Sequence, residues 1–147
     1  MAFNTTTGGF TTAGLAHWMN TQVHGGTAVS PWYLLLIRDD NIATPPFAAA
    51  DTLPSHAGWE EGDEYSGNRK EFVEAASTTG STSNTASPAD FVVNLPGDTQ
   101  TFVGYALVSA ATGTTGTLLG EATFSGGSQA AVKGDTIRLT VTLTVAS

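Results

Sequence analysis

The stretch Asp135-Thr136-Ile137-Arg138-Leu139-Thr140-Val141-Thr142-Leu143-Thr144-Val145-Ala146 decides the fold. Its aliphatic residues alternate without a break against threonines and one arginine. Successive side chains of a strand point to opposite faces of a sheet, so the pattern predicts one long strand with a single buried face. Such a strand needs an opposing layer to cover its apolar row. The carboxyl half is therefore expected to be a β-sandwich or barrel.

Further strand signals precede this segment at regular spacing. Residues 32–37 (Trp-Tyr-Leu-Leu-Leu-Ile) predict a strand buried on both faces, and Lys133-Gly134-Asp135 predicts a hairpin into the final strand. Residues 77–86, nearly all small and polar, predict an exposed loop. Three sets of residues are each expected to share one strand face: Phe91, Val93 and Leu95; Val103, Tyr105 and Leu107; and Leu118, Gly120, Ala122 and Phe124.

These signals predict an all-β fold, an antiparallel β-sandwich of jelly-roll-like type. The expected organisation is an N-terminal arm over residues 1–30 and a sandwich domain over residues 31–147. The arm is expected to contain a short helix, capped by Thr11 or Thr12 and stopped by Gly25-Gly26. A long irregular excursion is expected over residues 39–68, because prolines and glycines interrupt it.

Composition excludes several classes of function. The chain has 147 residues, no cysteine and a formal net charge of −8, with only five lysines and arginines. Nucleic acid and anionic membrane surfaces both require a cationic face, so neither is an expected partner. The longest apolar run is too short to span a bilayer, and no secretory signal is visible. We therefore expect a protein made in a cytoplasm, with neither disulfides nor thiolate chemistry.

Charge is distributed unevenly along the chain. Residues 1–37 contain no charged side chain, whereas nine of the thirteen acids lie between Asp39 and Glu74. Buried interface cores are depleted in charge, so the arm is expected either to lie on the sandwich or to pack against another subunit or partner. The candidate interface residues are the large apolar side chains of the arm and two aromatic residues of the excursion: Phe3, Phe10, Leu15, Trp18, Met19, Trp59 and Tyr65.

Trp59 and Tyr65 lie in the acidic part of the excursion, where a large ring must find cover. Three interpretations remain open: the rings pin the loop to its own domain, fill a neighbour's pocket, or form a carbohydrate platform. The acids of residues 60–64 are interpreted as a solvated loop, since their spacing does not match that of an EF-hand. Whether they bind a cation is left open.

Residues that would support enzymatic chemistry are not recognisable. His17 and His24 are seven residues apart, not at the spacing of helical zinc ligands, and His56 is distant. The run Gly126-Gly127-Ser128-Gln129-Ala130 lacks the last glycine of a nucleophile elbow. We therefore assign no catalytic, cofactor-binding or metal-ligating residue and expect a protein that is not an enzyme.

A set of residues in the middle of the chain resembles small virion proteins of tailed bacteriophages. The first part is Asp51-Thr52-Leu53, His56, Gly58-Trp59-Glu60-Glu61, Tyr65 and Arg69. The second part is residues 103–107 (Val-Gly-Tyr-Ala-Leu), residues 116–119 (Gly-Thr-Leu-Leu), Phe124 and residues 134–137 (Gly-Asp-Thr-Ile). The similarity covers residues 50–145, and the arm matches less closely.

This resemblance implies a structural protein of the capsid decoration (cement) type, on the outer surface of the assembled head. The implied partners are the major capsid protein and other copies of the chain, as a dimer or trimer. No catalytic residues come with the resemblance. The alternative is a tail or receptor-binding module that recognises a glycan. The carboxyl strands are expected to supply folding energy, and about the first 26 residues together with Asp51 to Arg69 are expected to supply attachment to the head.

Overall fold

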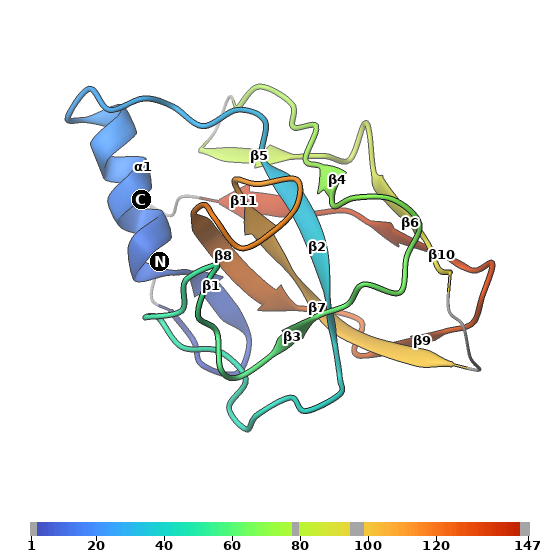
Figure 1. The fold of residues 1–147 in the computed structure, drawn as a ribbon. Coiled ribbons are helices and arrows are strands. Elements are labelled where there is room, and N and C mark those ends of the chain that lie inside the picture. The colour runs from blue at the N-terminus through green and yellow to red at the C-terminus, as the bar shows by residue number, and fades with distance from the viewer. Residues whose placement is uncertain (1–2, 78–79, 95–98, 145–147) are drawn as a thin grey trace.

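A computed structural model describes residues 3–77, 80–94 and 99–144 of the chain. These residues form antiparallel sheets and one short helix, α1 (Thr12–Gln22), so the expected all-β class is confirmed at this level (Figure 1). Within the same residues, no helix is both long and apolar enough to cross a membrane.

The centre of the molecule is a seven-stranded sheet, and two two-stranded ribbons accompany it. Along the sheet the order is β1-β8-β7-β2-β3, with β4 also paired to β2 and β9 to β7. These strands are β1 (Gly8–Phe10), β2 (Tyr33–Arg38), β3 (Glu60–Glu61), β4 (Lys70–Glu71), β7 (Gln100–Val108), β8 (Leu118–Thr123) and β9 (Gln129–Ala131). The ribbons pair β6 (Ala89–Val92) with β10 (Thr136–Leu139), and β5 (Ser81–Ser83) with β11 (Thr142–Thr144).

Strand β2 is buried on both faces, as its uninterrupted apolar sequence predicts. Leu34 and Leu36 point into one core cluster, and Leu35 and Ile37 point into a second. The first cluster lies between the sheet and the ribbons, and includes Phe91, Val93, Phe102, Leu107, Ile137, Leu139 and Val141. The second cluster lies on the other face of the sheet, where residues 47–59 of the excursion cover it with Phe47, Leu53 and Trp59.

The predicted final strand is divided in two. Ile137, Leu139 and Val141 are buried as the alternation predicts, but pairing passes from β6 to β5 between β10 and β11. The side chain of Asn84 takes the place of a strand neighbour there, since its Nδ2 donates to Leu139 O (3.1 Å) and its Oδ1 accepts from Val141 N (2.7 Å). Val145 lies outside the described residues.

Asn84 also corrects the prediction for residues 77–86. The segment is not merely an exposed loop, because Ser81–Ser83 form β5 and Asn84 is completely buried. The polar composition of residues 77–86 favours the prediction of an exposed loop and gives no sign of a strand or of a buried side chain. A buried amide that satisfies two backbone groups costs little, because its polar atoms retain hydrogen-bond partners.

Two register shifts overturn the predicted strand faces. The β2–β7 pairing skips Val103, so Val103 packs with the second cluster while Tyr105 and Leu107 pack with the first. The β7–β8 pairing shifts similarly at Leu107/Val108, and Leu118 then lies in the second cluster opposite Phe124. A bulge adds one residue and reverses the alternation beyond it, which a strict period of two does not anticipate. Leu95, expected to share a face with Phe91 and Val93, lies outside the described residues.

The predicted hairpin around Gly134 is also wrong. Residues 132–135 do turn tightly, with Asp135 N donating to Val132 O (3.0 Å), but the strands on either side do not pair with one another. Strand β9 pairs with β7 in the central sheet, and β10 pairs with β6 in a ribbon. The turn therefore carries the chain from one layer to the other.

The amino-terminal segment is attached to the sheet. Strand β1 pairs with β8 at its edge, and Thr11 is completely buried, donating its hydroxyl to Leu118 O (2.6 Å). The same hydroxyl accepts from Gly14 N (2.9 Å), which is the predicted cap of α1. A side chain at Gly14 would overlap the backbone of Leu119, so only glycine lets the helix approach β8 this closely.

Candidate interface

Helix α1 presents its apolar face to solvent. Leu15, Trp18, Met19 and Val23 expose 40%, 41%, 48% and 73% of their surface. The inner face includes Gly14, which is buried, and His17, whose ring meets Trp32 edge-on at 5.5 Å. Residues three and four apart share a helical face, so Leu15, Trp18 and Met19 form one continuous patch. We call Leu15, Trp18, Met19 and Val23 the helix face.

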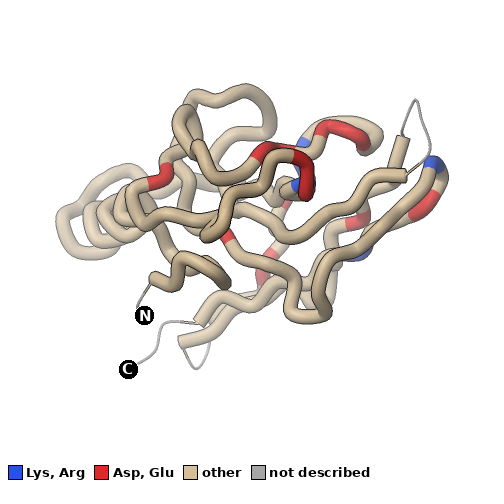
Figure 2. Tube along the Cα trace, turned by 90° about the horizontal axis from the view of Figure 1, so that it is seen from below, with Lys and Arg blue, Asp and Glu red and all other residues tan. Residues whose placement is uncertain are grey.

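The helix face is uncharged and belongs to an uncharged part of an acidic protein. No Asp, Glu, Lys or Arg occurs in α1, β1, β5, β7 or β11. Figure 2 shows the helix itself without charge, and most charged residues away from it. They lie in the excursion, in β3, β4, β6 and β10, in the turn between β9 and β10, and at Glu121 of β8. The protein has a net charge of −8, and burying an uncharged surface in an interface avoids the desolvation of charged side chains. This region is therefore the part of the surface that a partner could cover at the least electrostatic cost.

The two phenylalanines proposed as interface residues are only partly available. Phe3 is half-buried against the second core cluster, and Phe10 is half-buried against the first. Each contributes mainly to its own fold. Of the arm residues predicted to make contacts, the structure thus leaves Leu15, Trp18 and Met19 exposed together.

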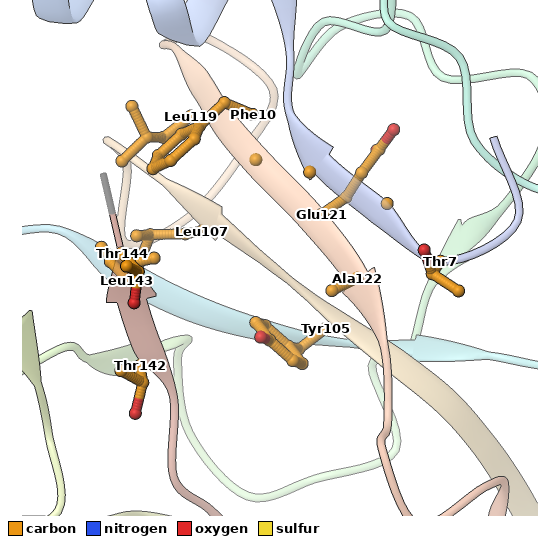
Figure 3. A pocket seen from close by; sticks show the side chains of 13 residues that line it. Thr7, Phe10, Tyr105, Leu107, Leu119, Glu121, Ala122, Thr142, Leu143 and Thr144 are labelled. Atoms are coloured by element: carbon orange, nitrogen blue, oxygen red, sulfur yellow. The ribbon is translucent and has the colours of Figure 1, made fainter. Parts of the chain in front are cut away.

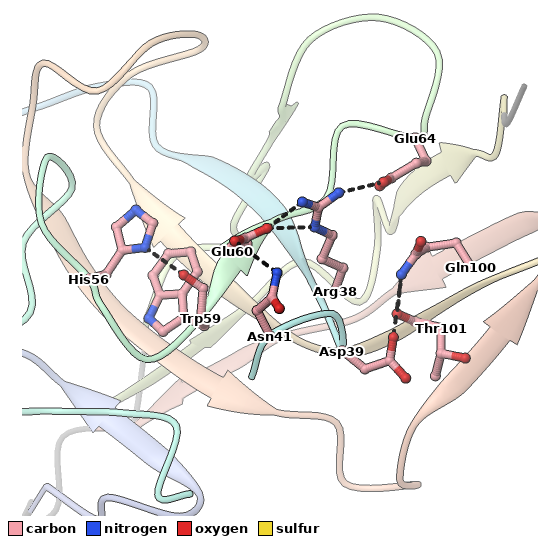
Figure 4. Close-up of polar contacts among 9 residues, drawn as sticks. All are labelled: Arg38, Asp39, Asn41, His56, Trp59, Glu60, Glu64, Gln100 and Thr101. Atoms are coloured by element: carbon pink, nitrogen blue, oxygen red, sulfur yellow. Dashed lines mark hydrogen bonds and ion pairs between the residues drawn. The ribbon is translucent and has the colours of Figure 1, made fainter. Parts of the chain in front are cut away.

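Trp59 lies inside its own domain, which corrects its selection as an interface residue. It is 2% exposed, and its Nε1 donates to Glu121 Oε2 at 2.8 Å. His56 stacks on the indole with ring centroids 3.7 Å apart and also contacts Trp59 O through Nδ1 (Figure 4). Of the three interpretations left open for this ring, the structure places it as a pin for the loop.

Tyr65 is likewise buried and is no longer an interface candidate. Its ring meets Phe91 edge-on at 4.8 Å, and its hydroxyl donates to Glu61 Oε1 at 3.3 Å. Burial, assisted by the nearby Glu61 carboxylate, raises the pKa of Tyr65 above its usual value. The phenol therefore remains protonated and tied to the loop.

The acidic residues 60–64 are not simply a solvated loop, because arginines bind three of them. Arg38 donates to Glu60 and to Glu64, and its hydrogen bonds hold the pKa of Glu60 below its usual value (Figure 4). Arg69 is buried and donates to both carboxylate oxygens of Glu61 and to Ala110 O. The pairs fasten the loop to the sheet edge, and among the described residues no three His, Asp or Glu side chains gather as metal ligands would.

An open groove of about 200 Å³ separates β1 and β8 from β11 (Figure 3). Glycines make it hollow, because Gly8, Gly9 and Gly120 bring no side chain into it. Its apolar lining includes Phe10, Tyr105, Leu107, Leu119 and Leu143. This volume is below the range of most small-molecule sites, which hold roughly 300–1,000 Å³.

Sequence reasoning overlooked Glu121. It is the one charged residue of β8, and the structure places it almost completely buried beneath the excursion. The available signal was a lone acid within an otherwise uncharged strand. Such a residue needs a specific partner when buried, and here the partner is Trp59.

The residues that carry the phage resemblance are mostly structural here. Asp51 accepts from Ala48 N (3.0 Å), and His56, Trp59, Glu61, Tyr65 and Arg69 make the intramolecular contacts described above. The segment therefore specifies how the loop is held. No protein-family model matches the chain, and a search of curated proteins likewise finds no match.

Proposed function

We propose that the protein is a non-enzymatic structural component of a tailed-phage virion, a decoration protein that binds the outer surface of the assembled head. Its partner in this proposal is the major capsid protein. The decoration protein is made in the host cytoplasm and then binds the assembled head. The resemblance across residues 50–145 supports this class of protein. The helix face is the single structural observation that supports attachment.

The attachment surface is assigned to α1 and not to the excursion. Trp59 and Tyr65 are buried within the chain, whereas Trp18 stands exposed on a helix that no other described segment covers on that side. A large aromatic side chain at the centre of a patch is the usual energetic anchor of an interface. Leu15 and Met19 flank it and exclude water around it.

Several copies acting together strengthen such an attachment. A single eleven-residue helix offers a small surface, but a dimer or trimer on the capsid lattice binds through two or three such helices at once. Among the described strands β1 ends the sheet order, and although Asn4 bonds the outer backbone groups of Gly8, the rest of this short edge leaves room for a contact between copies. We also propose that the sheet and ribbons form a jelly-roll-like sandwich, which the two-sided packing around the first core cluster supports.

The test is binding of purified protein to heads that lack it. Replacing Trp18 with Ser is expected to weaken binding at least about tenfold, since anchor residues contribute more than about 1.4 kcal/mol. Val132→Ser is the matched control, because Val132 is similarly exposed at 45% but lies far from α1 in the sequence and outside the uncharged strands. Equal binding by both variants contradicts the proposed attachment surface.

The alternative is a tail or receptor-binding module. The aromatic platform expected for a glycan would have been Trp59 and Tyr65, and their burial removes that support. Cryo-electron microscopy of the virion separates the two functions. Many copies over the shell agree with a decoration protein, and a few copies at the tail vertex overturn it.

A further inference from the structure

Glu121 is a buried acid whose two oxygens are treated differently by the fold. Its side chain is 2% exposed and extends from β8 away from Tyr105 and Leu107, toward the excursion (Figure 3). Oε2 accepts the hydrogen bond from Trp59 Nε1, whereas Oε1 is buried without a partner among the described residues. If Glu121 were ionised, its Oε1 would be a buried, negatively charged oxygen with neither water nor a donor to bind, which is energetically costly.

The nearest acid is Asp51, which is also buried. Its Oδ2 accepts from Ala48 N, and its charge acts on the neighbouring Glu121 carboxyl group, so the question is whether the two carboxyl groups could join by a hydrogen bond. Two carboxyl groups can form such a bond only when one of them carries the proton. A proton on Glu121 Oε1 would satisfy the orphaned oxygen and remove one of two adjacent negative charges.

The other charged groups nearby do not neutralise this pair. The two arginines of the excursion region are engaged elsewhere, Arg38 with Glu60 and Glu64 and Arg69 with Glu61. Strands β1 and β7 flank β8 and contribute only one titratable side chain, Tyr105, which lines the groove. The remaining neighbours are His56, stacked on Trp59, His17 of the packed helix, and Tyr33 beside the second cluster.

We propose that Glu121 holds a proton on Oε1 beside Asp51, and that this proton fastens residues 47–59 to β8 as a pH-sensitive latch. The latch consists of the Trp59–Glu121 hydrogen bond and the protonated contact with Asp51. Loss of the proton places two negative charges in one buried site, and their repulsion favours opening of residues 47–59 against the packing of Phe47 and Leu53. This inference does not depend on the proposed virion function.

The direction of the effect follows from the local environment. Burial, together with the neighbouring Asp51 carboxylate, raises the pKa of Glu121 to about 8. The latch is therefore closed in acid and at neutral pH and opens as pH rises through about 8.

The experiment follows hydrogen exchange of residues 47–59 in the full chain from about pH 6 to pH 10, corrected for intrinsic exchange rates. Wild-type protein is expected to lose protection with a midpoint near pH 8. Glu121→Gln is expected to lose this transition, because the carboxamide accepts from Trp59 and donates to Asp51 but cannot ionise. Asp51→Asn is expected to move the midpoint to lower pH, since the second charge is gone.

Glu74→Gln provides the matched control, because Glu74 is an exposed acid outside this site. It should reproduce the wild-type profile. A pH transition that persists in Glu121→Gln overturns the proposal. If that variant does not fold, the ¹³C shift of the Glu121 carboxyl group in wild-type protein decides, and titration near the ordinary glutamate value overturns it equally.

Discussion

Helix α1 and the excursion of residues 39–68 each contribute a large aromatic ring, yet the fold uses the two rings in opposite ways. Both place a tryptophan outside the regular strand pattern. Trp59 is buried because its indole finds an acceptor in Glu121 and a stacking partner in His56. Trp18 lies one turn after Gly14, the residue through which α1 docks on β8, and it stays 41% exposed because it flanks that contact and gains no acceptor there. Aromatic content alone therefore does not identify an interface; the availability of partners within the chain does.

The largest difference is expected between the effects of replacing Trp59 and of replacing Trp18 on the free energy of unfolding. Trp59→Ala should lower the free energy of unfolding by about 3–5 kcal/mol, because it leaves a cavity and an unpaired Glu121. Trp18→Ala should change it by less than about 1 kcal/mol, since the ring is already partly in water. Guanidinium denaturation of both variants measures the difference. Equal losses would show that α1 is as much a part of the core as the excursion.

The pH dependence of stability is the next largest effect. The pKa of Glu121 is about 8 when folded and near 4.5 when unfolded, so the folded state holds a proton that the unfolded state releases. Its stabilising contribution is complete below about pH 4.5, falls as pH rises, and is lost above about pH 8. With each pKa unit equivalent to ~1.4 kcal/mol, the loss is on the order of a few kcal/mol.

This dependence is isolated by comparing wild-type protein with Glu121→Gln at each pH. The difference in unfolding free energy between the two should shrink or change sign as pH rises from about 5 to 8. A constant difference would mean that Glu121 ionises normally in the folded state. The same comparison with a variant in α1 should show no such trend, because α1 has no acid.

Removing an arginine from an ion pair is expected to have a smaller effect on stability, and the effect should depend on how buried the pair is. Arg69→Ala should cost about 1–3 kcal/mol, since it removes the partner of Glu61 and the donor to Ala110 O from a mostly buried position. Arg138→Ala is the matched control: Arg138 pairs with Asp90 at the surface, and exposed pairs contribute little. Thermal denaturation should shift for the first variant only. A shift of similar size in both would argue against the excursion being fastened by Arg69.

The smallest effect on stability is expected from the helix face itself. Replacing Leu15, Trp18 and Met19 together with Ser should leave circular dichroism and the denaturation midpoint nearly unchanged. The unfolding free energy should change by no more than about 1 kcal/mol, while binding to heads is lost. If the triple variant unfolds, the helix face contributes to the fold. If it binds normally, attachment lies elsewhere.

Much of the local structure follows from sequence. The apolar run of residues 32–37 is the centre of the sheet, and Thr11 caps α1 as the pattern predicts. The absence of charge in the first 37 residues also appears in the structure as an uncharged β1 and α1, while its interpretation as an interface stays a prediction. These features depend on neighbours within a few residues, or on composition, and are therefore readable along the chain.

The remaining features depend on residues that are far apart in sequence. The final apolar stretch becomes two strands because Asn84, more than fifty positions earlier, takes over the hydrogen bonds at the break. Bulges in the β2–β7 and β7–β8 pairings reverse the faces of Val103 and Leu118, and the only local signal is a glycine beside each skipped residue, Gly104 and Gly120. Only the tertiary structure decided that Trp59 is buried and Trp18 is exposed. A buried indole N–H needs a hydrogen-bond acceptor, and the acceptor of Trp59 is Glu121, which lies 62 residues away in the sequence.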